Sequence, residues 1–137
     1  MVTGQVRSAQ RVRDLGEVLT AEREVTKMLD LLPPQAWVGG KNFYEPACGN
    51  GNFLEAILRR KLARVQRPTP KRFPQARAEF EVLLALGTIY GTDICARNVR
   101  ESRERMMAVL RAHLSETKPW NTLAVPQAFW SMAERII

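Results

Sequence analysis

The residues best suited to chemistry lie in one glycine-rich stretch, Glu45–Phe53, which reads Glu-Pro-Ala-Cys-Gly-Asn-Gly-Asn-Phe. It follows an apolar run that predicts a short buried strand, and it precedes an apolar periodicity that predicts a helix. Gly49 and Gly51 permit a tight turn and let a ligand approach main-chain amides directly. The helix start offers unpaired N–H groups and the positive end of a dipole, so an anionic cofactor group would bind well there.

Two missing motifs and the acid Glu45 indicate which kind of cofactor the glycine-rich stretch would bind. A dinucleotide fingerprint needs a third glycine where this chain has Leu54, and a phosphate-cradling loop needs Gly-Lys-Ser/Thr, which does not occur. Glu45 would repel a phosphate. It suits a cofactor that carries an ammonium or sulfonium near a carboxylate, as S-adenosylmethionine does.

Three motifs give the chain a resemblance to the cofactor-binding half of S-adenosylmethionine-dependent DNA adenine methyltransferases, which include the modification subunits of restriction systems. Gly16–Thr20 is similar to the amino-terminal motif, although Ala21-Glu22 replaces the proline that usually follows the threonine. Glu45–Phe53 resembles the glycine-rich motif almost without departure. Tyr90–Ile94 resembles the motif in which an acid at a strand end accepts hydrogen bonds from the ribose. The matches extend over residues 16 to 100.

The resemblance implies a role for each matching residue. Glu45 and Asp93 would orient the polar groups of the cofactor, and Ile94 would pack against its adenine ring. Thr20 and the amides of Ala47–Gly51 would receive the methionine carboxylate. The expected cofactor-binding residues are Thr20, Glu45, Pro46, Ala47, Cys48, Gly49, Gly51, Phe53, Asp93 and Ile94.

Each of these residues alone has a simpler explanation. Thr20 is more often just a helix cap, and Asp93 is more often a strand-end acid or a cap for the next helix. Cys48 is expected to be a small buried residue, because no base accompanies it as a nucleophile would require. The three motifs in order, each at the end of the expected element, favour a cofactor site over these separate explanations.

The catalytic motif of this family does not occur. These methyltransferases carry Asn or Asp, then Pro-Pro and an aromatic residue, which together hold a flipped-out adenine. The only Pro-Pro is Pro33-Pro34, which Gln35 follows and which precedes the glycine-rich motif. No catalytic residue is named, and the chain by itself is expected to be inactive. The motif order excludes the permuted class, in which the catalytic motif comes first.

Alternating apolar segments and breakers predict the elements that position these motifs. Strand alternating with helix implies an α/β fold with a parallel sheet. The expected helices are Thr20–Leu32, Phe53–Leu62, Gln75–Leu86, Ala96–Leu114 and Pro126–Glu134, and the expected strands are Asn42–Glu45, Thr88–Ile94 and a third that begins at Arg135–Ile137. The helix Gln75–Leu86 is expected to bury Ala76, Phe80, Leu83 and Leu84 and to end at a left-handed Gly87.

Together with the resemblance, this pattern predicts an incomplete Rossmann-like methyltransferase fold, made of the first strands and helices of the parallel sheet and a leading helix. Residues 1–15 are expected to be a frayed N-terminal segment. Residues 16–137 are expected to be the N-terminal part of an S-adenosylmethionine-binding methyltransferase domain, without its catalytic half or a target-recognition domain.

The net charge of +7 comes from one segment, Arg59–Arg72, with seven basic residues and no acid, while the rest of the chain is neutral. Its first cations close a helix, where they offset the negative dipole end. That end lies at the rim opposite the cofactor, because ligands of open α/β sheets bind beyond the carboxyl ends of the strands. A solvated helix end is therefore favoured over a DNA contact.

The amino-acid composition also bears on whether the chain is disulfide-bonded, zinc-binding or membrane-spanning. Two cysteines without a Cys-x-x-Cys pair indicate neither a disulfide framework nor a zinc site, and fit reduced thiols in a cytoplasm. No apolar run approaches the roughly 18 residues that a membrane span needs.

The expected function is transfer of a methyl group from S-adenosylmethionine to adenine in DNA, as part of a restriction-modification type enzyme with DNA as its partner. A non-catalytic interaction or regulatory protein and a methyltransferase acting on RNA or protein stay open as alternatives. So does a homo- or hetero-oligomeric state.

Overall fold

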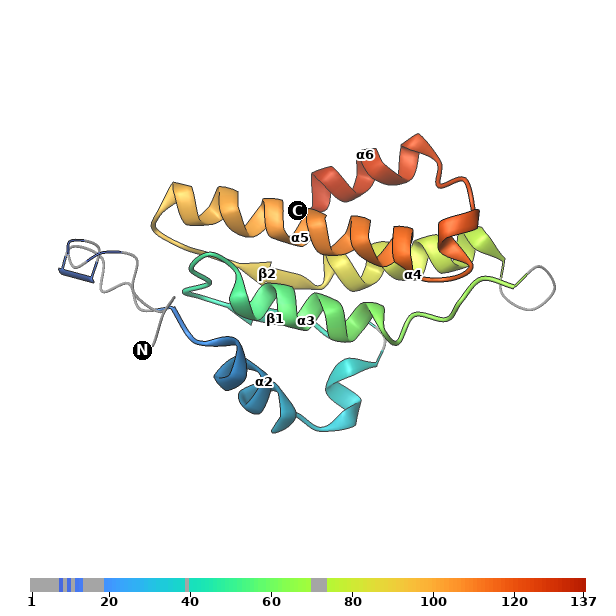
Figure 1. Cartoon of the computed structure of the whole chain (residues 1–137). Helices are drawn as coiled ribbons and strands as arrows, with labels where there is room; N and C mark the ends of the chain where they lie inside the picture. Colours follow the sequence, from blue (N-terminus) through green and yellow to red (C-terminus); the bar gives the residue numbers. More distant parts are fainter. Residues whose placement is uncertain (1–7, 9, 11, 14–18, 39, 70–73) are drawn as a thin grey trace.

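A two-stranded parallel sheet lies at the centre of a largely helical α/β structure in the computed structural model (Figure 1), which describes residues 8, 10, 12–13, 19–38, 40–69 and 74–137. Five α-helices with defined bounds accompany the sheet within these residues. In chain order the elements are α2 (Glu22–Asp30), η1 (Pro34–Trp37), β1 (Phe43–Glu45), α3 (Asn52–Leu62), α4 (Gln75–Gly87), β2 (Ile89–Gly91), α5 (Ala96–Glu116), η2 (Trp120–Thr122) and α6 (Gln127–Ile136).

The two strands run parallel because α3 and α4 form the crossover between them. Phe43 pairs with Ile89, and Glu45 pairs with Gly91. Backbone bonding continues past the strands, since the Thr92 N–H donates to the Glu45 carbonyl oxygen at 3.0 Å. The carboxyl ends of both strands therefore meet at one edge of the sheet.

The helices cover one face of the sheet. Phe43 and Ile89 pack against the buried clusters, as alternation along a strand requires. Tyr44 and Tyr90, which face each other in the register on the other side, are 65% and 51% exposed. Parallel sheets are usually buried on both faces, so this exposed aromatic face departs from the common pattern.

Most of the core lies between α3, α4, α5 and α6; in Figure 1, α5 and α6 lie above the sheet and α3 lies in front of it. The largest fully buried side chains of this core are Leu58, Leu62, Val82, Leu86, Leu110 and Phe129. A second cluster, of Val25, Leu29, Trp37 and Ile57, fixes α2 and η1 against α3. Because α3 contributes to both clusters, it positions the glycine-rich turn that precedes it.

The predicted buried face of the third expected helix, α4, is wrong for Ala76 and Phe80, which are exposed, whereas Leu83 is half-buried against the main core. The buried residues of α4 are Ala78, Val82, Ala85 and Leu86, and Phe80 is 55% exposed. The helix carries apolar residues around most of its circumference, so periodicity did not identify the inner face. The predicted left-handed end at Gly87 is also wrong, because Gly87 is helical and the helix ends at Thr88 with a negative φ.

The predicted third strand at Arg135–Ile137 is wrong as well. The helix α6 continues to Ile136 after an N-cap at Pro126. Phe129 and Ala133 are buried at a spacing of four residues, and Ile137 packs against the same cluster. This helical spacing keeps one apolar face on α4 and overrides the strand preference of the two isoleucines. Among the helices of the described residues, none has the length and apolar composition to cross a bilayer.

We expect Leu86→Ala to lower the free energy of unfolding by about 2–5 kcal/mol, because Leu86 is fully buried. Phe80→Ala on the same helix is the matched control and should change it by no more than about 0.5 kcal/mol. Urea denaturation followed by circular dichroism measures both values. A larger loss for Phe80→Ala would contradict the observed orientation of α4.

Candidate cofactor site

The glycine-rich turn joins β1 to α3 at the carboxyl edge of the sheet. Gly49 has φ +53° and Gly51 has φ +93°, both in the left-handed region that favours glycine. Gly51 is the N-cap of α3, and no side chain of the described residues caps this helix. The first amides of α3 are thus available to an anionic group, as the sequence predicted.

The Asp93 carboxylate joins this turn to the residues that follow β2. Its Oδ2 accepts the Gly49 N–H at 2.9 Å, and its Oδ1 accepts the Cys95 N–H at 2.7 Å and an Asn98 N–H at 3.3 Å. Asp93 therefore closes a turn onto Cys95, two residues further on, and also holds the glycine-rich turn, but it caps no amide within α5. A carboxylate has about four acceptor positions, so these three bonds leave room for a ligand hydroxyl.

The second acid of the site, Glu45, ends β1 beside the turn. Its Oε1 accepts the Ala47 N–H at 3.2 Å. Burial raises the pKa of the Cys48 thiol, and the negative charges of Asp93 and Glu45 raise it further. Both carboxylates therefore lie close enough to Cys48 for their negative charges to raise its pKa, and the same negative charges would favour a cationic group at this edge.

Thr20 lies next to the start of α3. The Asn52 side chain donates to the Thr20 carbonyl oxygen at 2.8 Å, and a Cβ on Gly49 would stand 3.4 Å from the Leu19 side chain. The structure therefore brings the end of the amino-terminal motif to the glycine-rich turn. The preceding residues of that motif, 16–18, lie outside the described residues.

The other predicted site residues differ in their surroundings. Ile94 is 86% exposed, and Pro46 and Ala47 are exposed at the turn, where the Pro46 carbonyl oxygen accepts the Thr92 hydroxyl at 3.0 Å. Phe53 packs against the α2 cluster from the first turn of α3. Their contacts with a cofactor stay predictions.

A partly buried network behind the turn was not predicted from the sequence. Arg105 of α5 donates to the Asn50 carbonyl oxygen at 3.0 Å and to Asn52 Oδ1 at 2.7 Å, and it forms an ion pair with Glu55 at 2.6 Å. Burial raises the pKa of Glu55, but hydrogen bonds from Arg59 and Arg105 outweigh it, and the net shift is downward. Only the Glu55–Arg59 pair has a helical i,i+4 spacing that sequence reasoning can use.

One polar atom of this network lacks a partner. Asn50 Nδ2 donates to Glu101 at 3.3 Å, whereas Asn50 Oδ1 is buried and accepts no hydrogen bond from the described residues. A buried acceptor without a donor costs about 1–3 kcal/mol. A bound group or water that donates to this oxygen would recover that energy, so the atom supports a ligand site at the turn.

Neither a search for metal-binding clusters nor a comparison with known proteins assigns a function to this site. Within the part of the chain that the structure describes, no cluster of three or more His, Cys, Asp or Glu side chains could hold a metal ion. No protein-family model, curated protein or solved structure matches the chain.

Gly51→Ala should destabilise the fold by at least about 1–3 kcal/mol, because a left-handed backbone strains any other residue. The added Cβ would also lie 2.8 Å from the Ser102 Cβ of α5. Gly40→Ala is the control, because its Cβ would stand 3.7 Å from Leu84 and Gly40 has no positive φ. Thermal unfolding of both variants tests this; equal losses would contradict the strained turn.

Cys48 should react slowly with iodoacetamide at pH 8, because it is buried and its raised pKa keeps the thiol protonated. We expect Cys95, which is half-buried, to be labelled at least about tenfold faster. Peptide mass spectrometry of samples taken over time measures both rates. In urea the two rates should converge, and a fast Cys48 in the folded protein would reopen a nucleophilic role.

Proposed function

We propose that residues 16–137 form the cofactor-binding part of an S-adenosylmethionine-dependent DNA adenine methyltransferase of the restriction-modification type, with an incomplete Rossmann-like fold. The observation that carries the proposal is the bond between the Gly49 N–H and the Asp93 carboxylate. It brings a glycine-rich turn, an uncapped helix start and two strand-end acids to one edge of a parallel sheet, where open α/β sheets bind ligands.

The chemistry of this edge fits S-adenosylmethionine. The amides at the start of α3, with Thr20, would hold the methionine carboxylate, and the negative charges of Glu45 and Asp93 would favour the cationic groups. Asp93 would accept a ribose hydroxyl at its remaining acceptor position, and the exposed Ile94 would cover the adenine ring. S-adenosylmethionine supplies the methyl group when bound.

The choice of DNA adenine as the acceptor rests on the family resemblance of the three motifs. No residue of the chain matches the Asn/Asp-Pro-Pro-aromatic motif that holds the adenine. We therefore propose that this chain binds the cofactor and transfers no methyl group by itself.

A second candidate is a non-catalytic interaction protein that uses the same fold. It is favoured by the exposed sheet face of Tyr44 and Tyr90, since parallel sheets are usually covered on both faces. Cofactor binding separates the two candidates, because an interaction protein has no need of a functional site at the turn.

Calorimetric titration with S-adenosylmethionine tests the proposal. We expect saturable binding that Asp93→Asn weakens by about 10–100-fold, because hydrogen bonds to charged groups contribute roughly 1.5–3 kcal/mol. Glu45→Gln should also weaken it. Glu104→Gln, on the exposed surface of α5, is the charge-matched control and should leave the affinity unchanged.

Circular dichroism of each variant first establishes that it is folded, because Asp93 also holds the start of α5. No heat from folded protein at about millimolar cofactor, a concentration that detects binding free energies as weak as about −4 kcal/mol, would contradict the site. Unchanged affinity in folded Asp93→Asn would contradict the ribose role.

A further inference from the structure

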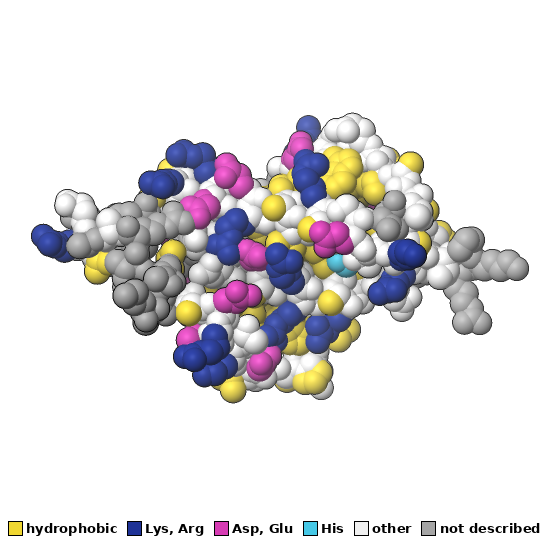
Figure 2. Space-filling view, in the orientation of Figure 1, with side chains coloured by type: hydrophobic (Ala, Val, Ile, Leu, Met, Phe, Trp, Pro, Cys, Tyr) yellow, Lys and Arg dark blue, Asp and Glu magenta, His cyan; other side chains and the backbone are white. Residues whose placement is uncertain are grey.

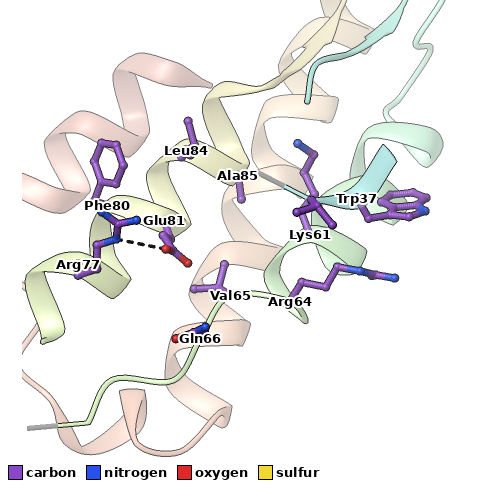
Figure 3. Close-up of a pocket in the computed structure, with 11 residues that line it drawn as sticks. Trp37, Lys61, Arg64, Val65, Gln66, Arg77, Phe80, Glu81, Leu84 and Ala85 are labelled. Carbon is purple, nitrogen blue, oxygen red and sulfur yellow. Dashed lines mark hydrogen bonds and ion pairs between the residues drawn. The ribbon is translucent and has the colours of Figure 1, made fainter. Parts of the chain in front are cut away.

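A cavity of about 610 Å³ lies between the end of α3 and the side of α4. Figure 3 shows Phe80, Glu81 and Leu84 along α4 on one side, and Lys61 of α3 with Arg64 just after that helix on the other, with Trp37 beyond them. This volume is within the roughly 300–1,000 Å³ of small-molecule sites.

The cavity is separate from the glycine-rich turn. Lys61, in its wall, donates to the carbonyl oxygen of Lys41 at 2.7 Å and to the Thr88 hydroxyl. These two residues precede β1 and β2, whereas Gly49 and Asp93 follow them. The cavity therefore lies at the amino edge of the sheet, and a ligand in it would not compete with one at the carboxyl edge.

Lys61 places a buried positive charge in the cavity wall. Lys61 is 4% exposed, and no carboxylate of the described residues forms an ion pair with it. Burial lowers the pKa of Lys61. Buried charges are usually paired, and an ammonium has three donors, of which Lys41 and Thr88 take two. The ammonium also lies 5.1 Å from the centre of the Phe43 ring. Because no carboxylate of the described residues neutralises it, its positive charge makes this wall attractive to an anion.

Arg64 adds a second cation on the same side. Its guanidinium lies 5.5 Å from the centre of the Trp37 ring, and it donates one hydrogen bond, to the Arg60 carbonyl oxygen at 2.9 Å. Across the cavity, Arg77 and Glu81 pair at 3.2 Å and offset each other. The lining is thus positive on the α3 side, while Glu81 disfavours a ligand with several negative charges.

The rest of the lining is apolar. Trp37 and Leu84 line the cavity, and Val38 and Phe80 line it with more than half of their surface exposed. An aromatic ring against Phe80 and Leu84 would bury this surface and would stack on Phe80. Trp37 is only 5% exposed and its ring already packs against Phe43 and Arg64, so it closes the far wall of the cavity.

We propose that this cavity binds a small aromatic monocarboxylic acid, with its ring against Phe80 and Leu84 and its carboxylate toward Lys61 and Arg64. The proposal is independent of S-adenosylmethionine binding, since it uses other residues at the other edge of the sheet.

The test is titration of the ¹⁵N-labelled full chain with 2-naphthoate, followed by NMR. We expect saturable shifts at the Trp37 indole and at Val65 and Ala85, with a Kd of about 10 μM to 1 mM. Neutral 2-naphthalenemethanol and inorganic phosphate should each bind at least about tenfold more weakly, because the alcohol lacks the carboxylate and phosphate lacks the aromatic ring.

The variants that test the proposal are at three exposed residues, Arg64, Arg97 and Phe80, where a substitution should not unfold the protein. Arg64→Gln should weaken 2-naphthoate binding at least about fivefold, since it removes one of two cations. Arg97→Gln, exposed on α5 away from the cavity, is the charge-matched control and should leave it unchanged. Phe80→Ala should weaken naphthoate and naphthalenemethanol alike, because it removes only the apolar contact.

Any one of these results would overturn the proposal: no saturable shift up to about 5 mM in folded protein, equal binding of the neutral alcohol, binding of phosphate as tight as that of naphthoate, or the same loss for Arg64→Gln and Arg97→Gln. Shifts centred on Gly49–Gly51 in place of Trp37 would also overturn it, because they would place the ligand at the turn.

Discussion

One hydrogen bond, from the Gly49 N–H to the Asp93 carboxylate, fixes the arrangement on which the carboxyl edge depends. It forms only because parallel pairing brings the two strand ends together, and the left-handed backbone of Gly49 is part of the turn that presents this N–H. The same carboxylate holds the Cys95 N–H at the entry to α5. Asp93 thus positions the turn, the end of β2 and the start of α5 together, so the site is organised without a ligand.

The sheet cannot supply the stability that this arrangement needs, because two strands of three residues are marginal on their own. The helix α3, which packs on the covered face of the sheet, supplies this stability. Leu58 belongs to the main cluster with α4 and α5, and Ile57 belongs to the cluster with α2 and Trp37. Burial on two sides holds α3 rigidly behind the turn, while Tyr44 and Tyr90 stay exposed on the opposite face.

The parts that were predictable from the sequence are those in which local residues determine local structure. The turn and its two glycines, the parallel α/β arrangement and the leading helix follow from breakers and short apolar runs. The inner face of α4 was not predictable, because a helix that is apolar almost all round has no preferred side until its neighbours are placed. The Arg105–Glu55 pair and the burial of Lys61 depend on partners about 50 and 20 to 27 residues away along the chain.

The basic segment shows why charge alone is a weak indicator of function. Arg59 and Arg60 form ion pairs with acids on α3 and α2, at 2.8 and 2.7 Å, and Lys61 is buried against the strand starts. Arg64 lies over Trp37. Lys61 and Arg64 lie at the amino edge, away from the turn, whereas Arg59 pairs with Glu55 of the network behind the turn. These four cations have partners within the fold, so the proposal of a nucleic-acid substrate depends on the cofactor motifs and not on the net charge of +7.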